Sequence, residues 1–141
     1  MDQFMTFLSA HPMLSAAWVG IFLAIVVTTV KIQFSPIKQL SPQELTFAVN
    51  KEEGIVLDIR PEKEFKTSHI LDAQHLSVEK INNNDLVALE KYKDKPIIVV
   101  CTAGITASGI ASKLFKAGYS KTSLLKGGMN AWVNAGLPVK K

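Results

Sequence analysis

The chain has 141 residues, 48% of them hydrophobic, and carries a formal net charge of +4. This length allows one modest domain with an appendage. The lysines alternate with acidic residues and form no basic cluster with interleaved aromatic side chains, so nucleic acid is not an expected partner. The single cysteine excludes an intrachain disulfide and suits a reducing compartment.

Residues 1–32 form an N-terminal segment, with no Asp, Glu, Lys or Arg between Gln3 and Val30. The run over about residues 12–31 is almost wholly apolar and matches the ~20 residues that a helix needs to cross a bilayer. A cleaved signal peptide is the alternative, but no basic region precedes the run and no small-x-small cleavage site ends it. We therefore predict one uncleaved transmembrane helix.

The charges that flank this run predict its orientation. Lys31 and Lys38 follow it closely, whereas no Lys or Arg precedes it. The positive-inside rule then places the N-terminus outside and the rest of the chain in the cytoplasm. We expect a single-pass protein of the inner (plasma) membrane, with another membrane protein as a candidate partner of the helix.

Residues 33–40 are polar, contain Pro36 and are expected to form a linker, so that the soluble domain covers residues 41–141. Ser41-Pro42-Gln43-Glu44 is a capping-box start for a helix. Apolar runs and amphipathic patterns alternate after it. The expected strands are 55–59, 74–78, 96–100 and 122–125, and the expected helices are 42–51, 61–66, 85–92, 107–117 and 129–135. This alternation is typical of an α/β domain with a parallel sheet.

Cys101 lies where a ligand would bind in such a domain. It follows the apolar strand 96–100 and begins a Gly-containing loop that leads into a helix. Ligands of parallel sheets bind beyond the carboxyl ends of the strands. Inward-turned N–H groups and the helix dipole favour a thiolate at this position. We interpret Cys101 as a reactive nucleophile; the alternative is a buried cysteine that packs as a small hydrophobic residue.

A cysteine in a strand–loop–helix cradle also occurs in phosphatases, which grip phosphate with an arginine six residues after the cysteine. Here that position is Ala107, and the only arginine of the chain is Arg60. Phosphatase and arsenate reductase chemistry are therefore not expected.

Five short motifs follow one another in a defined order. They are Asp58-Ile59-Arg60, Glu64-Phe65, His69-Ile70, the loop Cys101-Thr102-Ala103-Gly104-Ile105-Thr106, and Gly127-Gly128-x-x-Ala131-Trp132. This ordered set, over about residues 40–138, resembles the rhodanese (sulfurtransferase) family in its single-domain form. The resemblance implies a parallel-sheet α/β domain with helices on both faces, here preceded by the transmembrane helix.

The resemblance also implies a reaction. Cys101 would take a sulfane sulfur from a small donor such as thiosulfate, become a persulfide, and pass the sulfur to a thiol or another thiophilic acceptor. The residues expected to bind the anionic group are Thr102, Ala103, Gly104, Ile105 and Thr106. Gly104 lets the backbone bend, and the Thr106 hydroxyl can point at the anion. Members that favour thiosulfate often carry a basic residue after the cysteine, whereas Thr102 leaves this loop uncharged.

Other residues of the motifs have structural roles in this interpretation. Asp58 and Arg60 are expected to support the loop as a pair at the end of their strand, His69 to cap or pack, and Trp132 to lie in the core. His11 and His75 offer no ligand spacing with Cys101, so a metal is not expected. No other cofactor is expected either. A second hypothesis keeps the fold but assigns it little turnover, as a docking or persulfide-sensing module for a membrane or sulfur-trafficking partner.

Overall fold

The computed structural model describes the backbone of residues 1–141 and the side chains of residues 1–31 and 33–141. The chain forms two compact units, Met1–Pro36 and Ile37–Lys141. The first unit consists of helices α1 (Asp2–Ala10) and α2 (Pro12–Gln33). Helix α1 was not predicted from the sequence.

Helix α2 has the properties of a segment that can cross a membrane. Its stretch Pro12–Lys31 is long and apolar enough to do so by length and composition. Its hydroxyl groups are satisfied within the helix: Thr28 donates to the carbonyl of Ala24 at 2.8 Å, and Thr29 donates to that of Ile25 at 2.7 Å. Such internal bonds matter in hydrocarbon, where no water is present to satisfy polar groups.

The second unit is built on a five-stranded sheet in which every neighbouring pair is parallel. The strand order is β1-β6-β5-β2-β4. The bounds are β1 Lys38–Leu40, β2 Ile55–Asp58, β4 Gln74–His75, β5 Ile97–Val100 and β6 Thr122–Leu125. Strand β5 lies at the centre and all four of its side chains are fully buried, because both faces of the sheet are covered. The predicted parallel sheet is confirmed.

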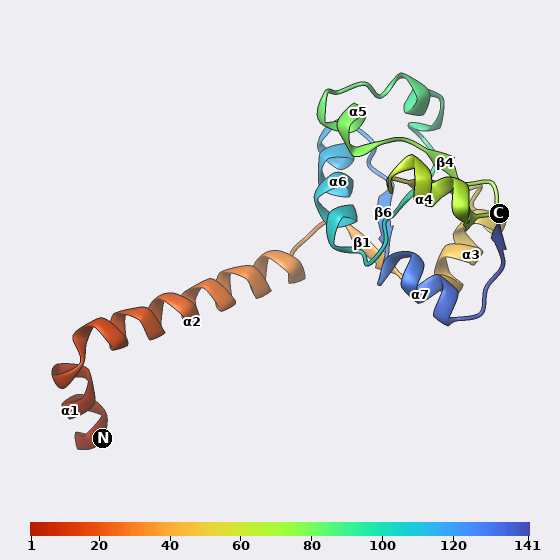
Figure 1. Ribbon diagram of the computed structural model, residues 1–141. Helices are drawn as coiled ribbons and strands as arrows, with labels where there is room; N and C mark the ends of the chain where they lie inside the picture. Colours follow the sequence, from red (N-terminus) through yellow and green to blue (C-terminus); the bar gives the residue numbers. More distant parts are fainter. The chain divides into compact units, whose positions relative to one another are not determined.

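Helices cover both faces of this sheet (Figure 1). Their bounds are α3 Pro42–Lys51, α4 Glu62–Thr67, α5 Val78–Asn82, the 3-10 helix η1 Val87–Tyr92, α6 Ile105–Lys116 and α7 Gly128–Asn134. Ile97 and Val99 of β5 belong to one core with α6, whereas Ile98 and Val100 belong to the other with α3 and α7. Successive strand residues point to opposite faces, so a single short strand contributes to both cores.

The capping box predicted for α3 is confirmed. Ser41 Oγ accepts from the backbone N–H of Glu44 at 3.2 Å, and a Glu44 carboxylate oxygen accepts from the backbone N–H of Ser41 at 2.7 Å. These bonds and the proline at the first helical position fix where the helix begins.

Several predicted elements differ in the structure. Residues 38–40 of the expected linker form the edge strand β1, which pairs with β6. The strand predicted over 74–78 ends at His75, and Val78 begins helix α5 because Ser77 caps it. The helix predicted over 85–92 is the 3-10 helix η1, which begins at Val87, and Asn84 before it is a turn residue with φ of 57°. A two-stranded antiparallel ladder, β3 (His69–Ile70) with β7 (Val139–Lys140), was not predicted.

Candidate active site

Cys101 follows directly on β5, at the carboxyl end of the sheet, as predicted. Its side chain is 6% exposed. Gly104 adopts φ of 90°, which turns the chain back over the cysteine, and its backbone N–H donates to Cys101 Sγ at 2.9 Å. An N–H group aimed at a sulfur atom stabilises negative charge on it. Helix α6 begins at Ile105, two residues earlier than predicted, so the turn that holds the sulfur is shorter than expected.

The residues that follow the Gly127-Gly128 turn are hydrogen-bonded to the backbone of this loop. The backbone N–H of Met129 donates to the carbonyl of Cys101 at 2.8 Å, and that of Asn130 donates to the carbonyl of Thr102 at 3.1 Å. Gly128 has φ of 59°, and a Cβ placed on it would lie 2.2 Å from the carbonyl oxygen of Cys101. Only glycine therefore allows the start of α7 to come this close to the loop.

A hollow of about 370 Å³ opens at Cys101. Its lining consists of Ile59, Arg60, Pro61, Val78, Cys101, Thr102, Ala103, Ile105 and Thr106. Five of the six predicted loop residues thus line one space, and the sixth, Gly104, contributes its N–H to the sulfur. Ile105 is 83% exposed, so the rim of this hollow presents an apolar side chain to solvent.

A second hollow of about 380 Å³ lies on the α7 side of the loop. It is lined by Arg60, Glu64, Ser68, Thr102, Met129, Asn130, Val133 and Asn134. Arg60 and Thr102 line both hollows, so the two spaces meet beside the residue that follows Cys101.

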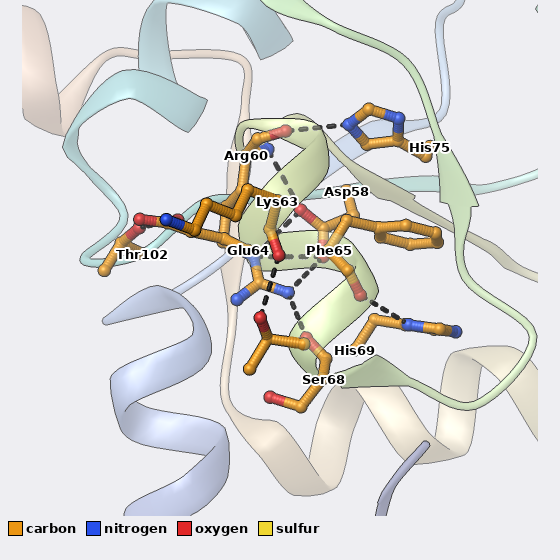
Figure 2. A network of polar contacts seen from close by, with 10 residues as sticks. Asp58, Arg60, Lys63, Glu64, Phe65, Ser68, His69, His75 and Thr102 are labelled. Carbon is orange, nitrogen blue, oxygen red and sulfur yellow. Dashed lines mark hydrogen bonds and ion pairs between the residues drawn. The ribbon is translucent and has the colours of Figure 1, made fainter. Parts of the chain in front are cut away.

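Asp58 and Arg60 form a buried pair beneath these hollows (Figure 2). A guanidinium nitrogen of Arg60 lies 2.7 Å from Asp58 Oδ2, and the Nε–H and the backbone N–H of Arg60 donate to Oδ1, both at 3.0 Å. The same guanidinium nitrogen donates to the carbonyl of Ser68 at 2.6 Å. These contacts hold the turn after β2 and place the two residues as a pair at the end of their strand, whereas their support of the Cys101 loop stays a prediction.

The nearby histidines also serve the fold. His69 Nδ1 hydrogen-bonds to the carbonyl of Phe65 at 2.8 Å, and His75 Nε2 hydrogen-bonds to that of Arg60 at 2.7 Å. Both rings stack on Phe65, with centroids at 4.0 and 4.8 Å. No group of three or more potential metal-ligating His, Cys, Asp or Glu side chains is found among the described residues. Trp132 lies in the core and its indole N–H donates to the carbonyl of Pro138, as expected for a packing residue.

Glu64 also belongs to the site, although the sequence indicated it only as part of a motif. The Thr102 hydroxyl donates to a Glu64 carboxylate oxygen at 3.3 Å (Figure 2). The two residues are 38 positions apart, and the contact arises because α4, which follows β2, faces the loop that follows the adjacent strand β5. No local pattern in the sequence signals this contact.

The family model of the rhodanese-like domain matches residues 41–135 of the chain. The chain belongs to the rhodanese-like family. The uncharacterized protein YibN of Escherichia coli strain K12 is 37% identical over 139 residues, which cover 99% of this chain and 97% of YibN. Thiosulfate sulfurtransferase GlpE of Coxiella burnetii is 32% identical over 95 residues, which cover 67% of this chain and 86% of GlpE.

Solved rhodanese-like structures share the fold. A rhodanese-related protein from Thermoplasma volcanium superposes with a TM-score of 0.65 at 21% identity, covering 73% of this chain and 97% of that protein. The rhodanese-like domain of Alr3790 from Anabaena gives a TM-score of 0.64 at 26% identity, covering 72% and 77%. The predicted rhodanese-like α/β fold is confirmed.

Proposed function

We propose that this rhodanese-like protein is a sulfurtransferase that forms a persulfide on Cys101 and passes the sulfane sulfur to a thiol or another thiophilic acceptor. The observation that carries the proposal is the Gly104 N–H aimed at Cys101 Sγ at 2.9 Å, beside an open hollow. The similarity to GlpE, a thiosulfate sulfurtransferase, supports it.

The loading step needs a thiolate and a donor with a leaving group. Cys101 thiolate attacks the outer sulfur of thiosulfate, the S–S bond of the donor breaks, and sulfite leaves with the electron pair. The loop N–H groups stabilise the negative charge of the persulfide and of the departing sulfite. A donor persulfide, RSSH, reacts in the same way and releases a thiol.

The second step returns the enzyme to its first state. An acceptor thiolate attacks the outer sulfur of the Cys101 persulfide, the S–S bond breaks, and the electron pair returns to Cys101 Sγ. The acceptor leaves as a persulfide after taking up a proton. The acceptor must come from another molecule because Cys101 is the only cysteine of the chain.

Helix α2 supports a membrane-anchored form of this enzyme, with the N-terminus outside and the rhodanese-like domain in the cytoplasm, at the inner (plasma) membrane. We expect full-length protein in the membrane fraction, and a soluble, folded domain after deletion of residues 1–32. A reporter fused after Lys141 should report the cytoplasm. Full-length protein in the soluble fraction, or a mature chain that starts after residue 30, would contradict the anchor.

A docking or persulfide-sensing module is the second candidate. The uncharged loop favours it, because Thr102 and Ala103 offer no cation to an anionic donor. Such a protein would hold a persulfide on Cys101 at most, turn over little, and act by binding a membrane or sulfur-trafficking partner.

The test is mass spectrometry of intact protein after exposure to thiosulfate or to a persulfide donor, beside a turnover assay with cyanide. We expect a persulfide on Cys101 and turnover that Cys101→Ser abolishes. Thr106→Ala should lose less than the ~10²–10³-fold typical of a deleted oxyanion donor, since the backbone N–H groups remain. If no donor yields a persulfide and Cys101→Ser keeps its cellular role, the docking module is the correct assignment.

A further inference from the structure

We propose that the Glu64 carboxylate selects the substrates of Cys101 by charge. It favours acceptor thiols that carry an ammonium group, and it disfavours acceptors that carry a carboxylate and dianionic donors such as thiosulfate. The inference rests on the proposed sulfur transfer and names the substrate class of the same site.

The two hollows differ from a neutral site by the charges of two side chains. Among the described residues that line them, the charged side chains are Arg60 and Glu64. Arg60 is engaged by Asp58 at 2.7 Å and by the carbonyl of Ser68 at 2.6 Å, so its charge is balanced within the protein. No ion pair joins Glu64 in the part of the chain described with side chains. The site therefore presents one unbalanced negative charge to a substrate.

The Glu64 carboxylate lies close to the loop that begins at Cys101. Glu64 is exposed and accepts from the Thr102 hydroxyl at 3.3 Å, and Thr102 is the residue next to Cys101. Neighbouring Cα atoms are about 3.8 Å apart, so the carboxylate lies on the order of a Debye length, about 8–10 Å, from the sulfur. A charge on a small substrate at Cys101 is thus within its reach, at the shared edge of the two hollows.

Apart from Arg60 and Glu64, the described residues that line the hollow on the α7 side carry no charge. The remaining lining there consists of the amides of Asn130 and Asn134 with apolar and hydroxyl side chains. Because Asp58 neutralises Arg60, an ammonium group that enters beside Cys101 meets Glu64 as the one charge of this described lining that has no ion-pair partner. During transfer, the acceptor thiolate attacks the outer sulfur of the persulfide while its ammonium group stays near Glu64 and reacts with nothing.

The size of the effect follows from Coulomb's law. One pair of unit charges at about 8 Å, with an effective dielectric constant between about 20 and 80, changes a rate or an affinity by roughly 2- to 30-fold. Removing the Glu64 charge should lower the KM for thiosulfate by at least this factor, because the donor carries two negative charges.

The experiment loads the full-length protein with persulfide and follows its loss in quenched-flow mass spectrometry with three small acceptors. These are cysteamine, which carries an ammonium group, 2-mercaptoethanol, which carries no charge besides the thiol, and 3-mercaptopropionate, which carries a carboxylate. Each rate of Glu64→Gln is divided by the wild-type rate for the same acceptor, so that the intrinsic reactivity of each thiol cancels.

We expect the ratio of the cysteamine rate to the 2-mercaptoethanol rate to fall roughly 2- to 30-fold in Glu64→Gln. The ratio of the cysteamine rate to the 3-mercaptopropionate rate should fall by roughly the square of that factor, because one acceptor loses an attraction and the other loses a repulsion. Added salt should lower both ratios in the wild-type protein, which tests the charge without any substitution. Glu62→Gln is the matched control. It lies on the same helix, pairs with Lys66 at 2.9 Å and lines neither hollow, so it should keep the wild-type ratios.

The proposal is overturned if Glu64→Gln changes the three acceptor rates by one common factor, or if Glu62→Gln has the same effect as Glu64→Gln. Failure of the proposed function appears earlier and separately, as the absence of any persulfide on Cys101 before an acceptor is added. In that case the inference falls with it.

Discussion

Replacing Asp58 with alanine is expected to destabilise the rhodanese-like domain by about 3–5 kcal/mol, the usual cost of leaving one partner of a buried ion pair alone. The Asp58 and Arg60 side chains are 1% and 8% exposed. In the variant, the guanidinium keeps the carbonyl of Ser68 but loses both carboxylate oxygens.

The effect is large against the stability of a small domain, which is typically about 5–15 kcal/mol. One kcal/mol corresponds to about 4–8 °C in Tm for a domain of this size, so the Tm should fall by about 12 °C or more. Thermal unfolding of residues 33–141, followed by circular dichroism, measures it. Glu62→Ala is the control, because it removes an exposed pair with Lys66 and exposed pairs contribute little.

A double variant separates the charge from the packing. Asp58→Ala with Arg60→Leu removes both charges, so part of the lost stability should return, since the cost arises from the uncompensated guanidinium. If Asp58→Ala alone shifts the Tm by less than about 4 °C, equivalent to less than about 1 kcal/mol, the pair does not hold this turn and the reasoning is refuted.

Two further predictions concern the backbone of the site and a helix cap. Gly128→Ala should lower the free energy of unfolding by at least about 1–2 kcal/mol, because alanine disfavours φ of 59° and its Cβ would meet the Cys101 carbonyl. Gly109→Ala is the control and should instead stabilise α6, since nothing lies within 4 Å of its Cβ. Equal changes in Tm for the two variants would contradict the close approach of Gly128 to the Cys101 loop. The N–H of Ser41, followed by its hydroxyl, lowers the pKa of Glu44 below its ordinary 4.5. The stability that this carboxylate contributes is therefore present above pH 4.5 and is lost as the pH falls through the lowered value. The Tm difference between wild type and Glu44→Gln should accordingly shrink on acidification, and a difference that grows would contradict this assignment.

The main elements could be predicted because each has a local cause. The run Ile97–Val100 is β-branched and apolar, which indicates a buried strand, and Ser41 with Glu44 marks the start of a helix by hydrogen bonds within four residues. The position of Cys101 at the end of that strand followed from the same reasoning. Short elements could not be predicted in this way. Strands β3 and β7 have two residues each, too few for a period, and they pair only because the C-terminal residues Val139 and Lys140 return to Ile70 and His69 in the middle of the chain.

The stretch Lys38–Leu40 shows the same limit. It was expected to be part of a linker because residues 33–40 are polar and are interrupted by Pro36. It becomes an edge strand because β6 offers an unpaired side, where Lys38 to Leu40 align with Ser123 to Leu125 and Leu40 is buried. This pairing joins segments more than 80 residues apart, and no window of sequence contains both.

The sequence by itself determined the rhodanese-like class, the apolar N-terminal helix and the place of the single cysteine after a buried strand, because these depend on local composition and on the order of motifs along one chain. The tertiary structure decided what surrounds Cys101. The order β6-β5-β2 brings α4 beside the loop after β5, so that Glu64 meets Thr102, and it places α7 where only Gly128 allows the backbones to touch. The charge of the site depends on these contacts between distant segments, and packing of the whole sheet creates them.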